Sequence, residues 1–376
     1  MIHTYLEQLL KRPSRRDVLR GLAGLATTMS IEGCAQFASS SLVAAPTPRP
    51  RGSVLASYRG HTGRVTAIAW APNGTYIASG SLDQTVQVWS VDGSKHFHPM
   101  LYRGHTAGVQ AVAWSPDGSR VVSGSIDTTV QVWHAFSGER IALYQGHTDD
   151  IVITVAWSPD GLSIASGSAD GTVRVWDVAT NKQKYANRDH TASVNSLVWS
   201  PDSQHIASGS SDKTVQIVDA ITGKRVFSYH GHSEAVNSIS WAPDGQYIVS
   251  GSSDKTAQIW HVSTGKLLYS YHGYNVQAAE HDSSKGVLPD LILAVAWSHH
   301  GKRIAASTQV YCGDSCGVLM SWDAYTEQHF TFGVDLPIFT LAWSPDDTRI
   351  ATSVVVSTQG DVASKTDGPY VQIIQA

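Results

Sequence analysis

Histidine, serine and aspartate recur together at regular spacings along this chain of 376 residues. These three residue types can supply a general base, a nucleophile and the carboxylate that orients the base, which is the chemistry of a serine hydrolase. A tryptophan follows each aspartate at a constant distance. The four complete sets are His61, Ser79, Asp83 and Trp89; His105, Ser123, Asp127 and Trp133; His147, Ser166, Asp170 and Trp176; and His232, Ser250, Asp254 and Trp260.

The repetition of these sets argues against catalysis. An active site needs to occur once, whereas several copies indicate a structural task, in which buried polar side chains carry hydrogen bonds from strand to turn to indole. The sets degrade toward the end of the chain, because Val218 stands where the fourth unit should have its tryptophan and Tyr274 replaces the histidine of the sixth. We therefore expect looser units from the fourth onward.

A second tryptophan gives the period of the elements that must position these side chains. It recurs at Trp70, Trp114, Trp157, Trp199, Trp241, Trp297 and Trp343. Runs such as residues 65–70 and 76–81 alternate or are apolar throughout, as half-buried and buried strands are, and Pro-Asp-Gly at 116–118 predicts a hairpin turn. From Trp70 to Trp241, successive tryptophans of this series lie 42 to 44 residues apart. Repeats of this length are typical of four-stranded propeller blades, so the sequence predicts seven small antiparallel sheets stacked in a ring.

The chain resembles the WD40 repeat family from residue 53 onward. The resemblance is carried by Gly-His at residues 60–61, 104–105, 146–147 and 231–232 and by the apolar runs that end in tryptophan. It implies an all-β, seven-bladed propeller over residues 53–376, with the four sets as structural tetrads. Residues 54–58 match the outer strand of other units, and the last unit has no room for a fourth strand. The N- and C-terminal strands are therefore expected to share the last blade and close the ring.

Charge and composition exclude some classes of function. The chain has a formal net charge of −4 and no basic stripe, which disfavours nucleic acid as a partner.

Cys312 and Cys316 predict a disulfide, with half of a metal site as the alternative. The histidine pairs at 96 and 98 and at 299 and 300 lack a carboxylate nearby in sequence, so we expect solvated loops. No metal or cofactor is predicted, and we expect a monomer.

The first residues resemble an export leader. Residues 14–20, which include Arg15 and Arg16, are similar to a twin-arginine signal, and the apolar run at 21–31 is too short to span a bilayer. Residues 31–34 look like a bacterial lipobox ending at Cys34. We predict an export signal at 1–33, a flexible tether at 34–52 and an extracytoplasmic protein anchored through lipid on Cys34. Cleavage between residues 34 and 45, or a cytosolic protein with an uncleaved N-terminus, are the alternatives.

The resemblance also implies where partners bind. WD40 domains meet partners at the narrow face, which is formed by the loops after each outer strand and between the two middle strands. The implied contact residues are Arg64, Thr66, Leu82, Gln110, Ile126, Ile151, Ile153, Leu291, Leu293 and Phe339. The hypothesis is an apolar arc with Arg64 as its charged anchor, which binds a peptide or protein. The alternative is that several of these side chains pack inward.

The leading hypothesis for function is a non-enzymatic binding scaffold. The alternative is a propeller enzyme with one site in the central channel or in the insertions at 275–289, 312–316 and 357–369, for example around Asp282, Asp314 and Asp361.

Overall fold

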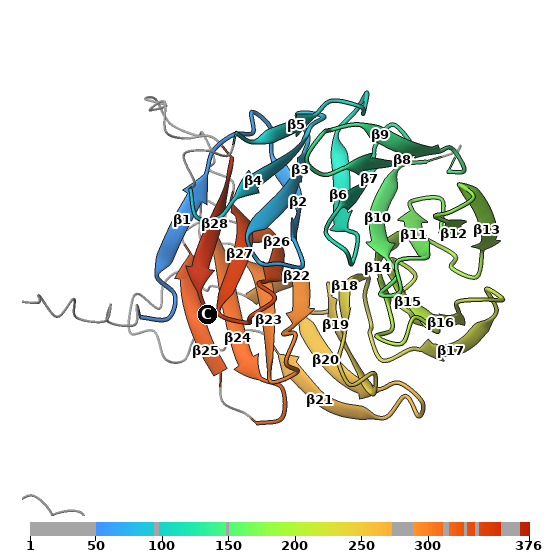
Figure 1. The fold of residues 1–376 in the computed structure, drawn as a ribbon. Coiled ribbons are helices and arrows are strands. Elements are labelled where there is room, and N and C mark those ends of the chain that lie inside the picture. The colour runs from blue at the N-terminus through green and yellow to red at the C-terminus, as the bar shows by residue number, and fades with distance from the viewer. Residues whose placement is uncertain are drawn as a thin grey trace, which may run out of the picture. The chain divides into compact units, whose positions relative to one another are not determined.

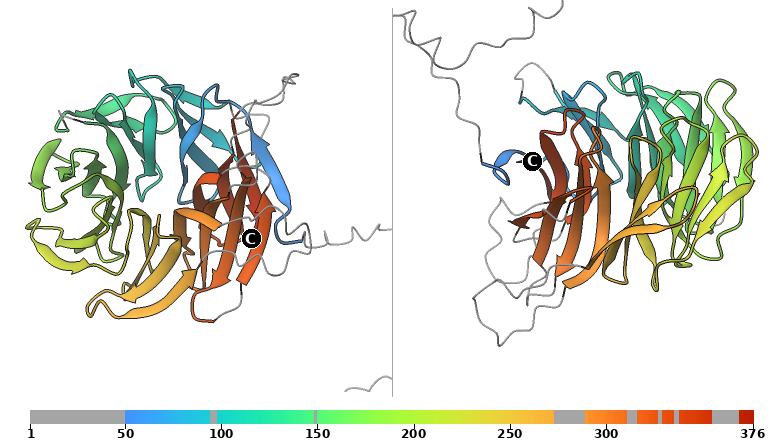
Figure 2. Two further views of the ribbon diagram at one scale, coloured as in Figure 1. Left: turned by 180° about the vertical axis from the view of Figure 1, so that it is seen from behind. Right: turned by 90° about the horizontal axis from the view of Figure 1, so that it is seen from below.

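Seven four-stranded antiparallel sheets make up the part of the chain that the structure describes. The computed structural model describes residues 50–93, 98–147, 150–272, 289–310, 316–326, 329–334, 338–354 and 369–376. Within these ranges no helix is long and apolar enough to cross a membrane. The first strands of neighbouring sheets contact one another in sequence around a ring, and the last of them contacts the first. Figures 1 and 2 show this ring, with the sheets following one another in chain order.

The strands of each blade run in order from the inside of the ring to its rim. Blade 1 contains β2 (Val65–Trp70), β3 (Tyr76–Ser81), β4 (Val86–Ser90) and β5 (Met100–Tyr102). Blade 2 contains β6 (Val109–Trp114), β7 (Arg120–Ser125), β8 (Val130–His134) and β9 (Arg140–Tyr144). Blade 3 contains β10 (Val152–Trp157), β11 (Ser163–Ser168), β12 (Val173–Asp177) and β13 (Lys182–Asn187). Blade 4 contains β14 (Val194–Trp199), β15 (His205–Ser210), β16 (Val215–Asp219) and β17 (Arg225–Tyr229).

The later blades follow the same plan. Blade 5 contains β18 (Val236–Trp241), β19 (Tyr247–Ser252), β20 (Thr256–His261) and β21 (Leu267–His272). Blade 6 contains β22 (Pro289–Trp297), β23 (Arg303–Val310), β24 (Cys316–Asp323) and β25 (His329–Val334). Blade 7 contains β26 (Ile338–Trp343), β27 (Arg349–Val354) and β28 (Tyr370–Gln375), with β1 (Val54–Tyr58) on its outside.

The two ends of the propeller meet in blade 7, which confirms the predicted closure. β1 pairs antiparallel with β28, with Val54 opposite Ile374 and Tyr58 opposite Val371. The amide of Gly52 also donates to the carbonyl of Gln375 at 2.8 Å. The fold class predicted from the repeats, a seven-bladed propeller closed by shared terminal strands, is therefore the observed one.

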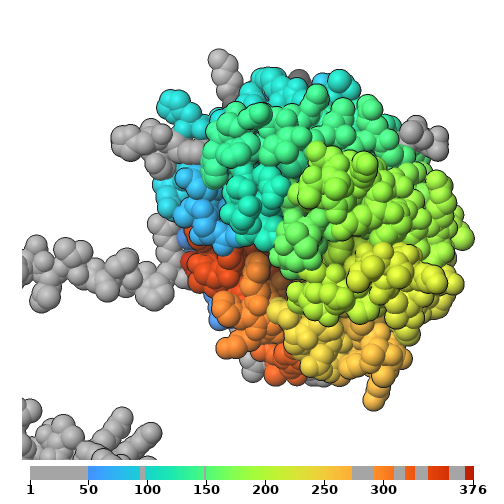
Figure 3. Space-filling model, turned by 45° about the vertical axis from the view of Figure 1, so that its right-hand side comes forward, coloured from blue at the N-terminus to red at the C-terminus, as the bar shows by residue number. Residues whose placement is uncertain are grey.

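Close packing between blades explains the Ser-Gly-Ser of the second strands. A Cβ on Gly124 would lie 2.6 Å from a methyl group of Val152 in the next blade, so only glycine fits there. The inner tryptophans add polar links across the same interface. The indole of Trp114 donates to the carbonyl of Ala69 at 3.0 Å, and that of Trp70 donates to Ala342 at 3.1 Å across the closure. Figure 3 shows adjoining blades in contact along their surfaces.

The turn between β22 and β23 has a contact that the sequence did not reveal. His299 and His300 lie in a turn with exposed side chains, as expected of solvated loop histidines, but they also contact Asp347 in the β26–β27 turn of the next blade. The backbone amides of His299 and His300 donate to Asp347 at 2.7 and 2.8 Å, and the Nδ1 atom of His300 lies 2.8 Å from Oδ2 of Asp347. The carboxylate lies some fifty residues away in sequence, so proximity along the chain could not reveal it.

Candidate functional site

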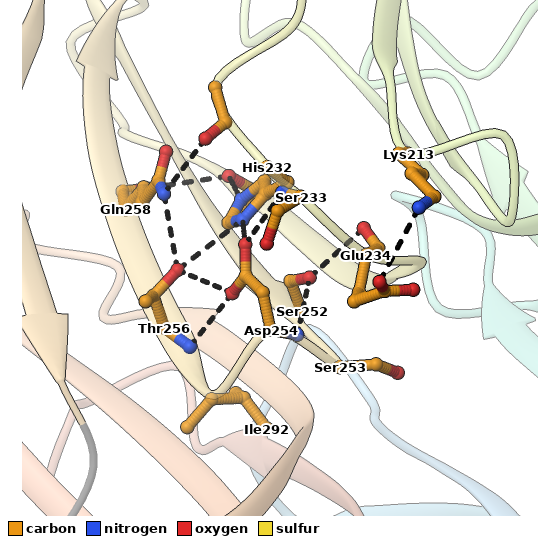
Figure 4. Close-up of polar contacts among 12 residues, drawn as sticks. Lys213, His232, Ser233, Glu234, Ser252, Ser253, Asp254, Thr256, Gln258 and Ile292 are labelled. Carbon is orange, nitrogen blue, oxygen red and sulfur yellow. Dashed lines mark hydrogen bonds and ion pairs between the residues drawn. The ribbon is translucent and has the colours of Figure 1, made fainter.

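Hydrogen bonds join the histidine, serine and aspartate of each predicted set, and in blade 5 they include the tryptophan. Nδ1 of His232 lies 2.8 Å from the carboxylate of Asp254, as Figure 4 shows. Nε2 of His232 lies 2.7 Å from the hydroxyl of Ser250. The indole of Trp260 donates to the same hydroxyl at 3.2 Å. Because a carboxylate only accepts, Nδ1 carries a proton toward Asp254, and in the neutral imidazole Nε2 accepts from Ser250.

The aspartate of the set also holds the turn between the second and third strands. The amides of Ser233 and Thr256 donate to Asp254 at 3.1 and 2.9 Å, and the hydroxyl of Thr256 donates at 2.6 Å. Burial alone would raise the pKa of Asp254, but hydrogen bonds from His232 and Thr256 outweigh it and hold the pKa well below its ordinary value. The carboxylate is therefore ionised, and both of its oxygens accept hydrogen bonds within the blade.

The other blades repeat this geometry with small differences. In blade 1, His61 lies 2.9 Å from Asp83 and 2.8 Å from Ser79. Blades 2 and 3 join His105 to Asp127 and Ser123, and His147 to Asp170 and Ser166. The indole nitrogen of Trp133 in blade 2 has no hydrogen-bond partner, whereas those of Trp89 and Trp176 donate to their serines.

Blade 4 contains a set that sequence reasoning missed. His190 lies 2.7 Å from Asp212 and 2.9 Å from Ser208, although Val218 occupies the place of the tryptophan. The signal was present, because His190 precedes Ser208 and Asp212 by the same intervals as His61 precedes Ser79 and Asp83. Asp189 stands where the other units have glycine before the histidine, which obscured it.

The connectivity of aspartate to histidine to serine is that of a hydrolase triad, but the position of the serines excludes that chemistry. Ser79, Ser123 and Ser166 are completely buried, and Ser250 is as well. In blades 1, 3 and 5 the hydroxyl also accepts a hydrogen bond from an indole. A nucleophile must reach a substrate carbonyl, and these serines cannot. Their function is to fix strand, turn and indole together.

A tyrosine on the outer strands β1, β5 and β17 extends the network to the next blade, and sequence reasoning did not predict it. The ring of Tyr102 in blade 1 stacks on Trp133 of blade 2 at 4.8 Å between ring centroids, and its hydroxyl donates to Gln131 at 2.6 Å. Tyr58 and Tyr229 make the same pair of contacts with Trp89 and Gln87 and with Trp260 and Gln258. The tyrosine stands three residues before the histidine in each case, and that constant spacing could have revealed it.

The predicted contact positions come together at the narrow face. The amide of Leu82 donates to the carbonyl of Arg64 at 2.9 Å, and the amide of Ile126 donates to Gly108 at 2.9 Å. Ala169 and Ile151 repeat this bond in blade 3 at 3.1 Å. In blades 1, 2 and 3 the loop before the first strand therefore lies against the turn that follows the second strand.

Among the predicted contact residues, the exposed ones lie on one part of this face. The guanidinium of Arg64 is exposed and lies 4.8 Å above the centroid of the Phe339 ring. Leu82 is 38% exposed and Ile126 is 37% exposed. The remaining predicted apolar positions, Ile151, Ile153, Leu291 and Leu293, are half-buried, as is Phe339. Blades 7, 1 and 2 thus present the exposed section of the predicted arc.

Comparison with known families agrees with this geometry. The family model described as "WD domain, G-beta repeat" matches residues 52–90, 98–134, 138–177, 181–219 and 223–261, just over half of the chain. The chain belongs to the WD40 repeat family. Each matched WD40 repeat begins with the outer strand of one blade and continues through the inner three strands of the next. This offset ties neighbouring blades together.

The curated relatives share single WD40 repeats with this chain. THO complex subunit 3 of Arabidopsis thaliana is 46% identical over 39 residues, which is 10% of this chain and 12% of that protein. WD repeat and FYVE domain-containing protein 2 of Mus musculus is 46% identical over 43 residues, 11% of each chain. Protein HIRA of Zea mays is 41% identical over 39 residues, 10% of this chain and 4% of that protein. The chain therefore spans only a small part of these relatives.

The predicted contact positions on the inner strands also link the WD40 blades. The hydroxyl of Thr66 contacts the carbonyl oxygens of Gly80 and of Val109 in blade 2. At the equivalent place, Asn195 donates to Val236 of blade 5 at 2.9 Å, and Asn237 donates to Ile292 of blade 6 at 2.9 Å. Gln110 occupies this place in blade 2 and is half-buried. Thr66, Asn195 and Asn237 therefore stabilise the contacts between neighbouring blades.

Several predicted features lie outside the described residues. They are Arg15, Arg16 and Cys34 of the leader, Cys312 of the predicted disulfide, and Asp282, Asp314 and Asp361. The backbone of Cys316 begins β24. Within the described ranges, no group of three histidine, cysteine or acidic side chains could hold a metal ion.

Proposed function

We propose that this protein is a non-enzymatic scaffold that binds a peptide or protein segment on the narrow face of its propeller. WD40 propellers generally bind proteins or peptides and are typically non-catalytic. The observation that carries the proposal is the exposed section of the arc, in which Arg64 stacks on Phe339 beside the exposed Leu82 and Ile126. Arginine is enriched among binding hot spots, and exposed apolar surface beside it can be covered by a partner.

The names of two relatives fit a role in assembly. One is a subunit of a complex, and another combines WD repeats with a second domain. We carry over only the general idea that a propeller holds other proteins, because the matched segments are single repeats.

A binding comparison tests the proposal. Leu82→Ser combined with Ile126→Ser should abolish capture of partners from the native extract, while Ile221→Ser, which changes a side chain that is 76% exposed in the β16–β17 turn, should not. Both variants must show the same thermal unfolding midpoint as the wild type. If the folded variant with both Leu82→Ser and Ile126→Ser captured the same partners as the wild type, the proposal would be wrong.

We further propose that the protein acts outside the cytoplasm, anchored by lipid on Cys34. The support is the resemblance of residues 14–20 to a twin-arginine signal and of residues 31–34 to a lipobox. Mass spectrometry of the mature N-terminus tests this proposal. An intact Met1 would contradict export, and a mature protein that begins after residue 34 and carries no lipid would contradict lipidation.

A further inference from the structure

The exposed section of the arc is a continuous path across three blades. The ring of Phe339 lies beneath the guanidinium of Arg64, and the carbonyl of Arg64 accepts the amide of Leu82. A Cβ on Gly108 would lie 2.8 Å from a methyl group of Leu82 and 3.2 Å from one of Ile126, so both side chains lie over this glycine. We call Phe339, Arg64, Leu82, Gly108 and Ile126 the anchor path.

The charge of Arg64 is not neutralised within the described residues. No carboxylate of the described ranges lies within ion-pairing distance of it, and its contact is the ring of Phe339. The acids of the adjacent turns, Asp83 and Asp127, have side chains that are 8% and 7% exposed and are bonded to their histidines. Among the side chains that the structure describes, the anchor path therefore presents one cation without a competing anion.

Stacking gives this cation a defined orientation. An arginine held over an aromatic ring uses one face of its guanidinium for the stack and keeps its N–H edge for acceptors. That edge matches the two oxygens of a carboxylate in a bidentate pair. Neighbouring apolar side chains exclude water when a partner covers them, which strengthens the pair.

The opposite sector of the same face shows the contrast. In blades 4 and 5, Asn195 donates to Ser211 at 3.0 Å, and Asn237 donates to Ser253 at 3.1 Å. Lys213 pairs with Glu234 at 3.4 Å, as Figure 4 shows. The polar groups of that sector are therefore bonded to one another, whereas the anchor path has an exposed charge and exposed apolar surface.

We propose that the anchor path binds a peptide segment in which an internal aspartate or glutamate lies beside an aliphatic or aromatic residue. The carboxylate pairs with the N–H edge of Arg64, and the apolar side chain covers Leu82 and Ile126. The acid is internal because the path continues on both sides of Arg64, to Phe339 in blade 7 and to Ile126 in blade 2. This inference rests on the proposed function and specifies the chemistry of its partner.

A peptide selection tests this chemistry. A random peptide library with constant flanking sequences, which leave no free carboxyl terminus, is selected on the full-length protein. We expect enriched peptides to share an acid beside an apolar residue. For the best peptide, replacing the acid by its amide should weaken binding about tenfold, which corresponds to about 1.4 kcal/mol. Arg64→Gln should cause the same loss, and Arg225→Gln, which changes an exposed arginine on β17, should cause none.

Combining Arg64→Gln in the protein with the acid-to-amide change in the peptide tests whether the two groups pair directly. On Arg64→Gln, the acidic peptide and its amide should bind equally, because the pair is already broken. If the enriched peptides lack acids, or if Arg64→Gln still distinguishes acid from amide, the inference is overturned while the scaffold function stands. If no enriched peptide loses affinity on Leu82→Ser combined with Ile126→Ser, binding at this face fails as well, and with it both proposals.

Discussion

The serine of each tetrad makes contacts that differ in number between blades, and this difference can be measured. Ser250 bonds both His232 and the indole of Trp260, whereas Ser208 bonds His190 and blade 4 has Val218 at the place of the tryptophan. A buried polar group that loses its partner costs about 1–3 kcal/mol. The number of groups left without a partner should therefore determine the loss of stability.

We predict that Ser250→Ala destabilises the propeller more than Ser208→Ala does. The first substitution leaves both an indole N–H and an imidazole nitrogen without a partner, and the second leaves only the imidazole nitrogen. The expected difference in the free energy of unfolding is about 1–2 kcal/mol, measured by urea denaturation. Equal losses would mean that the indole contributes nothing through its hydrogen bond.

The buried histidines predict how stability depends on pH. Burial lowers the pKa of His61 and of His147, although their aspartates oppose the shift. The unfolded chain then binds protons on these residues below about pH 6.5 while the folded protein does not, so stability falls as the pH decreases. The slope reaches up to about 1.4 kcal/mol per pH unit for each histidine.

The aspartates add a second loss at lower pH. Burial alone would raise the pKa of Asp83, but its hydrogen bonds outweigh burial and the pKa is lowered, so its contribution is present above about pH 4 and is lost as the pH falls through the folded-state pKa. Urea denaturation at a series of pH values should show a plateau above about pH 7 and a decline below about pH 6.5. His61→Gln should reduce the slope below about pH 6.5, and an unchanged slope there would contradict this account.

At the scale of elements, the turn between β26 and β27 is built differently from its equivalents. The φ of Asp347 is +55°, at a position where Gly74, Gly118 and Gly161 stand in other blades. Its carboxylate accepts the amides of His299 and His300 and contacts both imidazoles. The left-handed conformation is unfavourable for a residue other than glycine, so these bonds must offset the strain.

We predict that Asp347→Gly destabilises the junction of blades 6 and 7, although it relieves this strain. The amides of His299 and His300 lose their acceptor, which should cost about 1–3 kcal/mol. Ser203→Gly is the matched control, because Ser203 has a φ of +61° at the same turn position in blade 4 and accepts only the amide of Asp160. Its effect should lie within about 0.5 kcal/mol in urea denaturation. A neutral Asp347→Gly would show that backbone strain outweighs the hydrogen bonds.

The sequence predicted elements better than it predicted contacts between them. The strands, the hairpin turns and the seven units followed from period and from Pro-Asp-Gly turns, because these are local signals. The contact of Asp347 with His299 joins two turns that are far apart in sequence, and no local pattern reports it. The stack of Tyr102 on Trp133 was missed for another reason. Its spacing is regular, but a half-exposed tyrosine is common on an outer strand and did not by itself indicate a contact with the next blade.

The arc shows the same division between position and exposure. The positions of Arg64, Leu82 and Ile126 were implied by the resemblance to WD40 domains, yet their exposure depends on how blades pack. Ile151 and Ile153 occupy matching positions and are half-buried. The sequence could therefore predict which residues belong to the face but not which of them a partner can reach.

At the scale of the whole molecule, the ring depends on a contact between its two ends. β1 contributes a backbone ladder to β28, and Tyr58 on β1 stacks on Trp89 of blade 1 at 4.5 Å and donates to Gln87 at 2.6 Å. One strand thus joins blade 7 to blade 1 by the same link that joins other neighbouring blades. Removing it leaves β28 with an open edge and blade 1 without its outer tyrosine.

We predict that a chain beginning at residue 60 is less stable than a chain beginning at residue 50, which retains β1. Backbone bonds at about 1 kcal/mol each and an aromatic stack of about 1 kcal/mol give an expected loss of about 3–5 kcal/mol in urea denaturation. A synthetic peptide of residues 50–60 added in trans should restore part of that loss, since it can pair with the free edge of β28. Equal stability of the two chains, with equal hydrodynamic radius, would mean that packing of β26 against β2 alone keeps the ring closed.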